Sequence, residues 1–261
     1  MQFLSYLVNG ISLGSIYAVI ALGYTMVYGI ARMLNFAHGD VIMVGGYVAF
    51  VMMTSLGLPA LAAICAAVVV CTLLGVAIER VAYKPLREAP SLAVLITAIG
   101  MSYLLQNLAL YVTGGLNKTY PTIPWISDQV DLFGATTKRV TLITPVLTII
   151  LVILLVQLIN HTKVGMAMRA VAKDFETSQL MGIKINNVIS VTFIIGSFLA
   201  AVGSMLYFSN YPGVVPTSGA MPGLKAFVAA VFGGIGSIPG AVIGAFIIGV
   251  FESLIKGLDT I

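Results

Sequence analysis

At residues 147–156 the sequence reads LTIILVILLV, which is apolar on every face of a helix, and the run 140–162 around it contains no charged residue. Residues 60–70, ALAAICAAVVV, have the same character. A helix that crosses a bilayer needs about 20 apolar residues, whereas a strand of a membrane β-barrel alternates apolar and polar residues. These stretches therefore predict membrane-spanning helices and exclude a transmembrane β-barrel.

The rest of the chain repeats this pattern. Charged residues make up 8% of the 261 residues and hydrophobic residues 59%, whereas a soluble protein carries roughly 25% charged residues. The longest charged stretches, 79–88 and 163–184, have the size of loops. Composition therefore excludes a soluble protein, and it excludes an appended catalytic or nucleotide-binding domain. Each charge-free run is long enough to cross a bilayer: 1–31, 41–78, 89–117, 140–162, 185–224 and 226–251.

Proline and glycine breakers divide these runs into predicted membrane segments. The last two are short and glycine-rich, so the region 223–256 holds either a re-entrant pair or two crossings. We predict an all-α, polytopic transmembrane helical bundle with about seven to eight membrane segments, forming a single domain over residues 1–261. The predicted segments are 3–30, 40–56, 59–83, 90–113, 141–160, 187–209, 223–236 and 239–256.

Lys and Arg residues concentrate on one side of this predicted bundle. The loops 31–39, 79–89 and 161–186 carry eight of the 13 positive residues, and the other side carries five. Because positive residues flank spans on the cytoplasmic side, we predict that these three loops are cytoplasmic and that the N-terminus and the connection 114–140 are external. The net charge of +4 follows from this bias and does not indicate a nucleic-acid partner.

Small residues recur at the four-residue spacing that lets two helices approach closely in lipid. One series, in the first segment, contains Gly10 and Gly14, and the other, near the end of the chain, contains Gly236, Gly240 and Gly244. We predict that these glycines lie at helix–helix contacts.

Uncharged polar residues also recur inside the charge-free runs. In hydrocarbon such groups face either protein or a water-filled path. They therefore form hydrogen bonds between helices or line a polar, uncharged pathway for a small solute. The candidates for the second role are Tyr17, Asn35, Tyr103, Asn107 and Ser197.

Ionisable residues are predicted at the ends of the segments, with Asp40, Glu79 and Glu252 as the acidic examples and His38 in a cytoplasmic loop. A proton-coupled transporter usually has a buried carboxylate or histidine relay, and none is predicted here. A phosphate-binding Gly-x-x-x-x-Gly-Lys-Ser/Thr loop, a set of metal ligands and a Ser–His pair suited to hydrolysis are also missing. We predict no enzyme, no metal and no cofactor, so another subunit must supply the energy for any active transport.

The segment 161–186 combines mixed charge with helical periodicity and ends at Gly182, which is typical of a helix stop. Any solvated loop between two spans has a similar composition. Alternatively, a short helix that ends in glycine fits a groove on a cytoplasmic partner.

Two longer motifs make the chain resemble a known family, the branched-chain amino-acid permeases of bacterial ABC importers. The first begins Gly-Ser-Ile-Tyr-Ala at residues 14–18 and leads into Asn-Phe-Ala-His-Gly-Asp at 35–40. The second is Glu-Arg-Val-Ala-Tyr-Lys-Pro-Leu-Arg at 79–87, followed by Leu-Ile-Thr-Ala-Ile-Gly at 95–100. In addition, Glu-Thr-Ser-x-x-x-Gly at 176–182 resembles the Glu-Ala-Ala-x-x-x-Gly coupling loop of ABC-importer permeases.

The resemblance implies a permease subunit of an ATP-driven importer in the bacterial inner membrane, surrounded by membrane lipid. The implied partners are a second, related permease subunit, two cytoplasmic ATPase subunits and a periplasmic binding protein. Leucine, isoleucine and valine are the implied substrates, although relatives handle other amino acids, amides or urea. By the same resemblance, the 161–186 loop couples to the ATPase through Glu176, Thr177, Ser178 and Gly182, with Arg169 nearby.

Two other readings stay open. A passive channel of similar length would work without ATP, although the paired Asn-Pro-Ala motifs of water channels are missing from this sequence. A membrane scaffold or enzyme would not co-purify with an ATPase. Family members usually continue into one more apolar segment after a loop like the one at 256–259, so we expect this chain to be shorter than its relatives by one helix.

Overall fold

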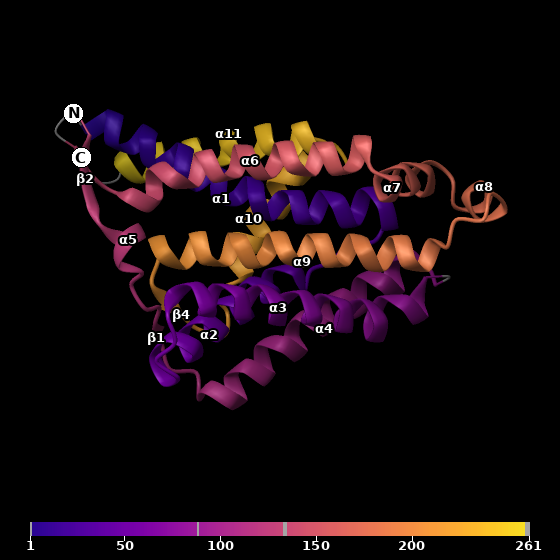
Figure 1. Ribbon diagram of the computed structural model, residues 1–261, viewed down its shortest axis with the longest axis horizontal. Coiled ribbons are helices and arrows are strands. Elements are labelled where there is room, and N and C mark those ends of the chain that lie inside the picture. The colour runs from indigo at the N-terminus through magenta and orange to yellow at the C-terminus, as the bar shows by residue number, and fades with distance from the viewer. Residues whose placement is uncertain (1, 88, 133–134, 259–261) are drawn as a thin grey trace.

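The computed structural model describes residues 2–87, 89–132 and 135–258. Its long helices lie side by side along one axis, with short strands at one end and two short helices at the other (Figure 1). We call these the β1 end and the α8 end. The helices are α1 (Gln2–Ala31), α2 (His38–Phe50), α3 (Ala60–Ile78), α4 (Ser91–Thr113), α5 (Pro124–Ser127), α6 (Arg139–His161), α7 (Lys163–Lys173), α8 (Phe175–Leu180), α9 (Ile185–Asn210), α10 (Ala220–Phe232) and α11 (Ile238–Leu258).

Among the described residues, six helices are long and apolar enough to cross a membrane. They confirm the predicted all-α polytopic bundle. The other two predicted segments, 40–56 and 223–236, correspond to the shorter helices α2 and α10. The six spans are Ser5–Ala31, Ala60–Leu86, Ser91–Thr113, Arg139–His161, Ile185–Asn210 and Ile238–Gly257.

Helix α1 forms the centre of the bundle and packs against α6, α9, α10 and α11. Residues 16–22 are all at most 3% exposed, because these neighbouring helices surround α1. Helix α11 runs close along α1, since a Cβ atom added at Gly14 would lie 2.8 Å from the Cα of Phe246. A Cβ atom added at Gly10 would likewise lie 2.9 Å from the Cα of Val250.

The three glycines predicted near the end of the chain lie around the turn between α10 and α11. Gly240 and Gly244 let α11 pack on the backbone carbonyl groups of Gly233 and Ala229. Gly236 lies in the turn itself and faces Gly29 of α1.

Residues 32–37 connect α1 to α2 without a helix, within the loop predicted at 31–39. This connection is not solvated: the chain turns back into the bundle, so that Asn35 and Ala37 are buried. Tyr83 holds this segment by donating its hydroxyl to the carbonyl oxygen of Leu34 at 3.2 Å and to Oδ1 of Asn35 at 3.1 Å. As a result α2 begins inside the bundle, with His38 only 1% exposed.

Two helices continue in altered form. Helix α2 passes into the π-helical turn η1 (Val51–Ser55). Helix α3 passes into the π-helical turn η2 (Glu79–Tyr83) and then the 3-10 turn η3 (Lys84–Leu86). The η2 turn buries both Glu79 and Tyr83, so the predicted cytoplasmic loop 79–89 starts within the packed bundle.

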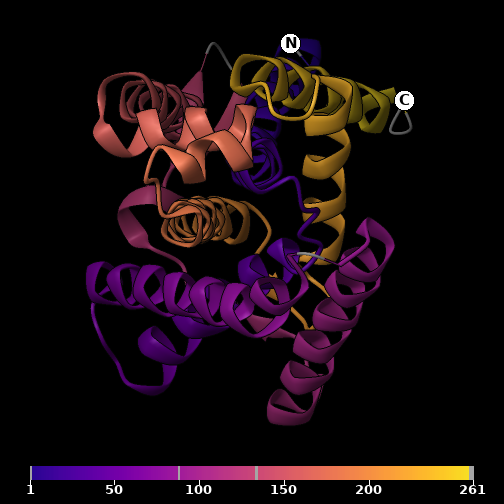
Figure 2. The ribbon, with the colours of Figure 1, turned by 90° about the vertical axis from the view of Figure 1, so that its right-hand side faces the viewer.

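Helix α10 runs across the long axis of the bundle rather than along it, as both views show (Figures 1 and 2). It has 13 residues, which at about 1.5 Å per residue is too short to cross a bilayer. An extended stretch brings the chain to it, in which β4 (Gly213–Val214) pairs antiparallel with β1 (Lys118–Thr119). Neither arrangement predicted for 223–256, a re-entrant pair or two crossings, matches the structure fully. Helix α11 is long enough to cross a bilayer, and α10 is not.

A second pair of strands, β2 (Gln129–Leu132) and β3 (Ala135–Lys138), forms a hairpin in the connection 114–140. The strands are confined to connections, and the helices carry the fold.

Candidate functional site

Helix α8 projects from the end of the bundle, where it forms the outermost part of Figure 1. Asp174 caps its first turn by accepting the N–H groups of Glu176 at 2.9 Å and Thr177 at 3.2 Å. The Thr177 hydroxyl also donates to this carboxylate. These bonds hold the pKa of Asp174 below its ordinary value, with the Thr177 hydroxyl as the largest cause.

The other end of α8 closes at Gly182, which confirms the predicted helix stop. Gly182 has a φ of +82°. Its N–H donates to the carbonyl oxygen of Gln179 at 3.0 Å, and that of Ile183 donates to Ser178 at 3.0 Å. This is the Schellman pattern, which requires a left-handed residue and so favours glycine. The preceding Leu180 and Met181 are 87% and 78% exposed.

Arg32, directly after α1, binds the corner between α7 and α8. Its guanidinium donates to the carbonyl oxygens of Ala172 at 3.0 Å and Lys173 at 3.2 Å, at the end of α7. It also lies 5.6 Å from the centre of the Phe175 ring. These contacts of Arg32 therefore position the start of α8 on the bundle.

The structure brings four of the five predicted coupling residues together on this corner. Glu176 and Thr177 are exposed on α8, and Gly182 follows it. Ser178 points inward and donates its hydroxyl to the Asp174 carbonyl oxygen at 2.6 Å. Arg169 lies apart on α7, where it donates to the carbonyl oxygen of Ile159.

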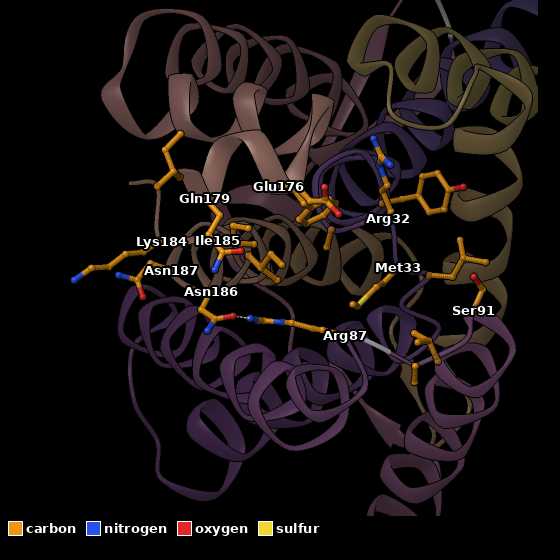
Figure 3. A pocket seen from close by; sticks show the side chains of 18 of the residues that line it. Arg32, Met33, Arg87, Ser91, Glu176, Gln179, Lys184, Ile185, Asn186 and Asn187 are labelled. Carbon is orange, nitrogen blue, oxygen red and sulfur yellow. Dashed lines mark hydrogen bonds between the residues drawn. The ribbon is translucent and has the colours of Figure 1, made fainter. Parts of the chain in front are cut away.

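A cavity of about 1320 Å³ opens at the α8 end. Its walls are the end of α1, the α8–α9 corner, the connection after α3 and the start of α4. Figure 3 shows Arg87 reaching from the α3 side towards Asn186 at the start of α9. Among the described residues that line the cavity, three are cationic, namely Arg32, Arg87 and Lys184, and one is acidic, Glu176.

Arg87 links two parts of the cavity wall. Besides the Asn186 amide oxygen, it binds Glu79 in a salt bridge. Glu79 is fully buried and accepts a further hydrogen bond from Ser190 at 3.0 Å. The network therefore connects η2 and the turn after η3 with the first two turns of α9.

The five predicted pathway residues do not meet in one cavity. Tyr17 donates its hydroxyl to Glu252 at 2.9 Å, and Asn35 accepts from Tyr83. Ser197 is buried on α9 against Gly75 of α3. Tyr103 and Asn107 lie on an exposed face of α4. Three of them make or adjoin contacts between helices, and the pathway role of all five stays a prediction.

Sequence reasoning missed the buried acidic residues. Asp40 and Glu79 lie at the ends of α2 and α3, as predicted, but they are 1% and 0% exposed. The side chain of Glu252 is 14% exposed and binds Lys225 at 2.6 Å and Lys256 at 2.8 Å. His38 is also buried, with its ring 4.6 Å from that of Tyr24. The signal available in the sequence was that Asp40 and Glu79 directly flank the charge-free run 41–78 and that Glu252 directly follows the run 226–251.

Within the described ranges, no three His, Cys, Asp or Glu residues are placed to hold a metal ion. The candidate site therefore consists of the α8 corner, a cavity beside it and buried charges deeper in the bundle.

A family model matches residues 6–259 of this chain, nearly its whole length; its description is "Branched-chain amino acid transport system / permease component". The chain belongs to this family. The resemblance drawn from the motifs is confirmed, and the chain is a transport permease with several transmembrane helices.

Individual relatives agree. The permease is 43% identical over 263 residues to the high-affinity branched-chain amino acid transport system permease protein BraD of Pseudomonas aeruginosa. The aligned residues make up 97% of this chain and 86% of BraD. The LivH proteins of Salmonella typhimurium and Escherichia coli, which carry the same description, are each 41% identical over 265 residues, with the same coverage. No solved structure matches the permease significantly.

Proposed function

We propose that the permease is one of two membrane-spanning subunits of an ATP-driven importer for leucine, isoleucine and valine in the bacterial inner membrane. The family match and the names of the relatives support the substrate class. In this proposal the N-terminus and the connection 114–140 face outward and the α8 end faces the cytoplasm, in agreement with the positive residues in 161–186.

The proposed partners are a second, related permease subunit, two ATPase subunits and a periplasmic binding protein. The observation that carries the ATPase contact is the pair Leu180 and Met181. Two large apolar side chains exposed at the tip of a rigidly capped helix suit insertion into a groove of another protein. The Glu176–Gly182 motif forms that same helix.

ATP-driven movement of this partner would reach the bundle by two routes. One is the Arg32 contact with the end of α7. The other is the start of α9, where Asn186 and Ser190 join the Arg87–Glu79 network. Rocking of helices then opens the path on alternate sides.

Replacing Leu180 with Asp tests the docking contact. We expect L180D to insert into the membrane and pair with the second permease subunit, but to lose co-purification with the ATPase subunits and ATP-dependent leucine uptake in proteoliposomes. A matched control is Leu116→Asp, since Leu116 is also exposed, at 66%, but lies near the β1 end.

Retention of ATPase and uptake by L180D would refute the docking assignment. Uptake by the intact complex without ATP would instead favour a passive channel. Competition of labelled leucine with other amino acids, amides and urea distinguishes the proposed substrates from those of other family members.

A further inference from the structure

Three acidic residues within the bundle, of which Asp40 and Glu79 are buried and Glu252 is partly buried, differ in their partners. Glu79 binds Arg87 and Ser190, and Glu252 binds Lys225, Lys256 and Tyr17. Asp40, in the first turn of α2, has no cationic partner in the part of the chain that the structure describes. It is nevertheless 1% exposed.

The two oxygens of the Asp40 carboxylate have different surroundings. Oδ1 accepts a hydrogen bond of 2.9 Å from the Gln106 side chain of α4, which also donates to the Ser102 hydroxyl at 3.2 Å. Oδ2 is buried and has no hydrogen-bond partner. Among the buried side-chain atoms that lack a partner within the described residues, it is the one carboxylate oxygen.

A buried carboxylate is unfavourable unless a cation or several hydrogen-bond donors compensate it. The N-terminus of α2 offsets part of this cost, because Asp40 lies in its first turn. A carboxylate that accepts one side-chain hydrogen bond in a membrane bundle, and has no cationic partner among the described residues, points to a ligand that supplies the positive charge.

We propose that Asp40 binds the α-ammonium group of the amino acid as it passes through the permease. This inference rests on the proposed function, since a branched-chain amino acid carries an ammonium group and an otherwise apolar side chain. Gln106 orients the carboxylate through Oδ1 and leaves Oδ2 for the ammonium group.

Helix α4 provides the access. Its residues Ser91 and Leu95 line the cavity at the α8 end, and Leu95, Ser102 and Gln106 continue along the same face at seven- and four-residue spacing. Helix α4 is also the least buried of the six candidate spans, and it contacts the bundle mainly through α2 and η2. A movement of α4 away from α2 exposes Asp40 to the cavity.

The first test is Asp40→Asn in the complete complex, in which the shape of the side chain is kept and its charge is lost. At a saturating concentration of leucine-loaded binding protein we expect leucine uptake to fall about tenfold or more, as loss of an ionic hydrogen bond implies. Uptake is expressed per amount of assembled complex, which is measured by co-purification of the subunits. Asp40→Glu should restore part of the uptake, and Asp128→Asn, an exposed carboxylate at the β1 end, serves as the control.

The second test uses the unchanged complex, so its result does not depend on whether the Asp40→Asn variant assembles. A hydrophobic carbodiimide that modifies carboxyl groups is added during ATP turnover, and the modification of Asp40 is followed by peptide mass spectrometry. Leucine-loaded binding protein should slow the labelling of Asp40 relative to empty binding protein, whereas a purely structural carboxylate would not respond to substrate.

Wild-type uptake by Asp40→Asn, no labelling of Asp40 during turnover, or labelling that leucine does not change would each overturn the role of Asp40. These outcomes leave the proposed function intact when the unchanged complex imports leucine. If the unchanged complex imports no branched-chain amino acid, the proposed function fails and the inference fails with it.

Discussion

The Arg32 guanidinium donates a hydrogen bond of 3.0 Å to the carbonyl oxygen of Ala172, which lies 140 residues later in the chain. Arg32 has a φ of +53°, which is uncommon for a residue with a Cβ atom. The chain is therefore in an unfavourable backbone conformation directly after α1, at the residue whose side chain binds the end of α7.

Two substitutions separate these two properties of Arg32. Arg32→Ala loses the hydrogen bonds and keeps the backbone strain, whereas Arg32→Gly loses the same bonds and relieves the strain. We expect Arg32→Gly to be more stable than Arg32→Ala by about 1–2 kcal/mol, measured as apparent melting temperature of the solubilised protein. Both should show faster amide hydrogen exchange in α8 than the unchanged protein. Equal stability of the two variants would mean that the left-handed conformation carries no cost here.

Gly182 allows a similar test, because no atom lies within 4 Å of a Cβ atom added there, so that backbone conformation alone decides the effect. Gly182→Leu should weaken the end of α8 by about 1–2 kcal/mol, and Gly182→Asn, of similar size, by less, since Asn tolerates the left-handed region. Substrate-stimulated ATPase activity of the complex should follow the same order. Equal activity of the two variants would contradict a role for this turn in coupling.

Gly14 tests the packing of α1 on α11. A Cβ atom at this position meets the backbone at Phe246, so the two helices must separate in Gly14→Ala. We expect a loss of about 1–3 kcal/mol, read from thermal unfolding in detergent. The control is Gly100→Ala on α4, where nothing lies within 4 Å. A Gly14→Ala protein as stable as this control would show that the contact adapts without cost.

Asp174 predicts how the α8 cap responds to pH. Its pKa is lowered in the folded protein, so the ionised carboxylate stabilises α8 fully at pH values above the ordinary Asp pKa of about 3.9. This stabilisation is lost only as the pH falls through the lower pKa of the folded protein. Amide exchange in α8, corrected for its intrinsic pH dependence, should therefore be constant between about pH 5 and 8. Asp174→Ala should accelerate it throughout that range, and Asp174→Asn should do so less because Asn also caps helices well. Protection that falls between pH 7 and 5 would point to a different group.

The features that sequence reasoning recovered depend on local pattern. The apolar run at 147–156 lies in the middle of α6, and the position of Gly182 gave the end of α8. In both cases a stretch shorter than one helix carries the information, through hydrophobicity in the first and backbone conformation in the second.

The features that it missed depend on contacts between distant residues. Asp40 follows the segment 32–39, which was predicted to be a loop, and the contact of Tyr83 with Asn35 holds this segment inside the bundle. Likewise, the composition of α10 is that of a short membrane helix, and its crosswise direction follows from its packing on α1, α2 and α11. Two partners of Glu252, Tyr17 on α1 and Lys225 on α10, also come from helices that no local pattern connects.

The crosswise direction of α10 also sets a dimension of the permease. At one end Gly219 packs on the backbone of Gly39 at the start of α2, and at the other Gly233 packs on the backbone of Gly240 at the start of α11. Both contacts are between backbone atoms, so no flexible side chain can change its conformation to adjust the distance between the helices. Helix α10 is thus a spacer of fixed length, roughly 20 Å for its 13 residues, and a rotation of α11 must displace the start of α2 rather than compress the gap between them.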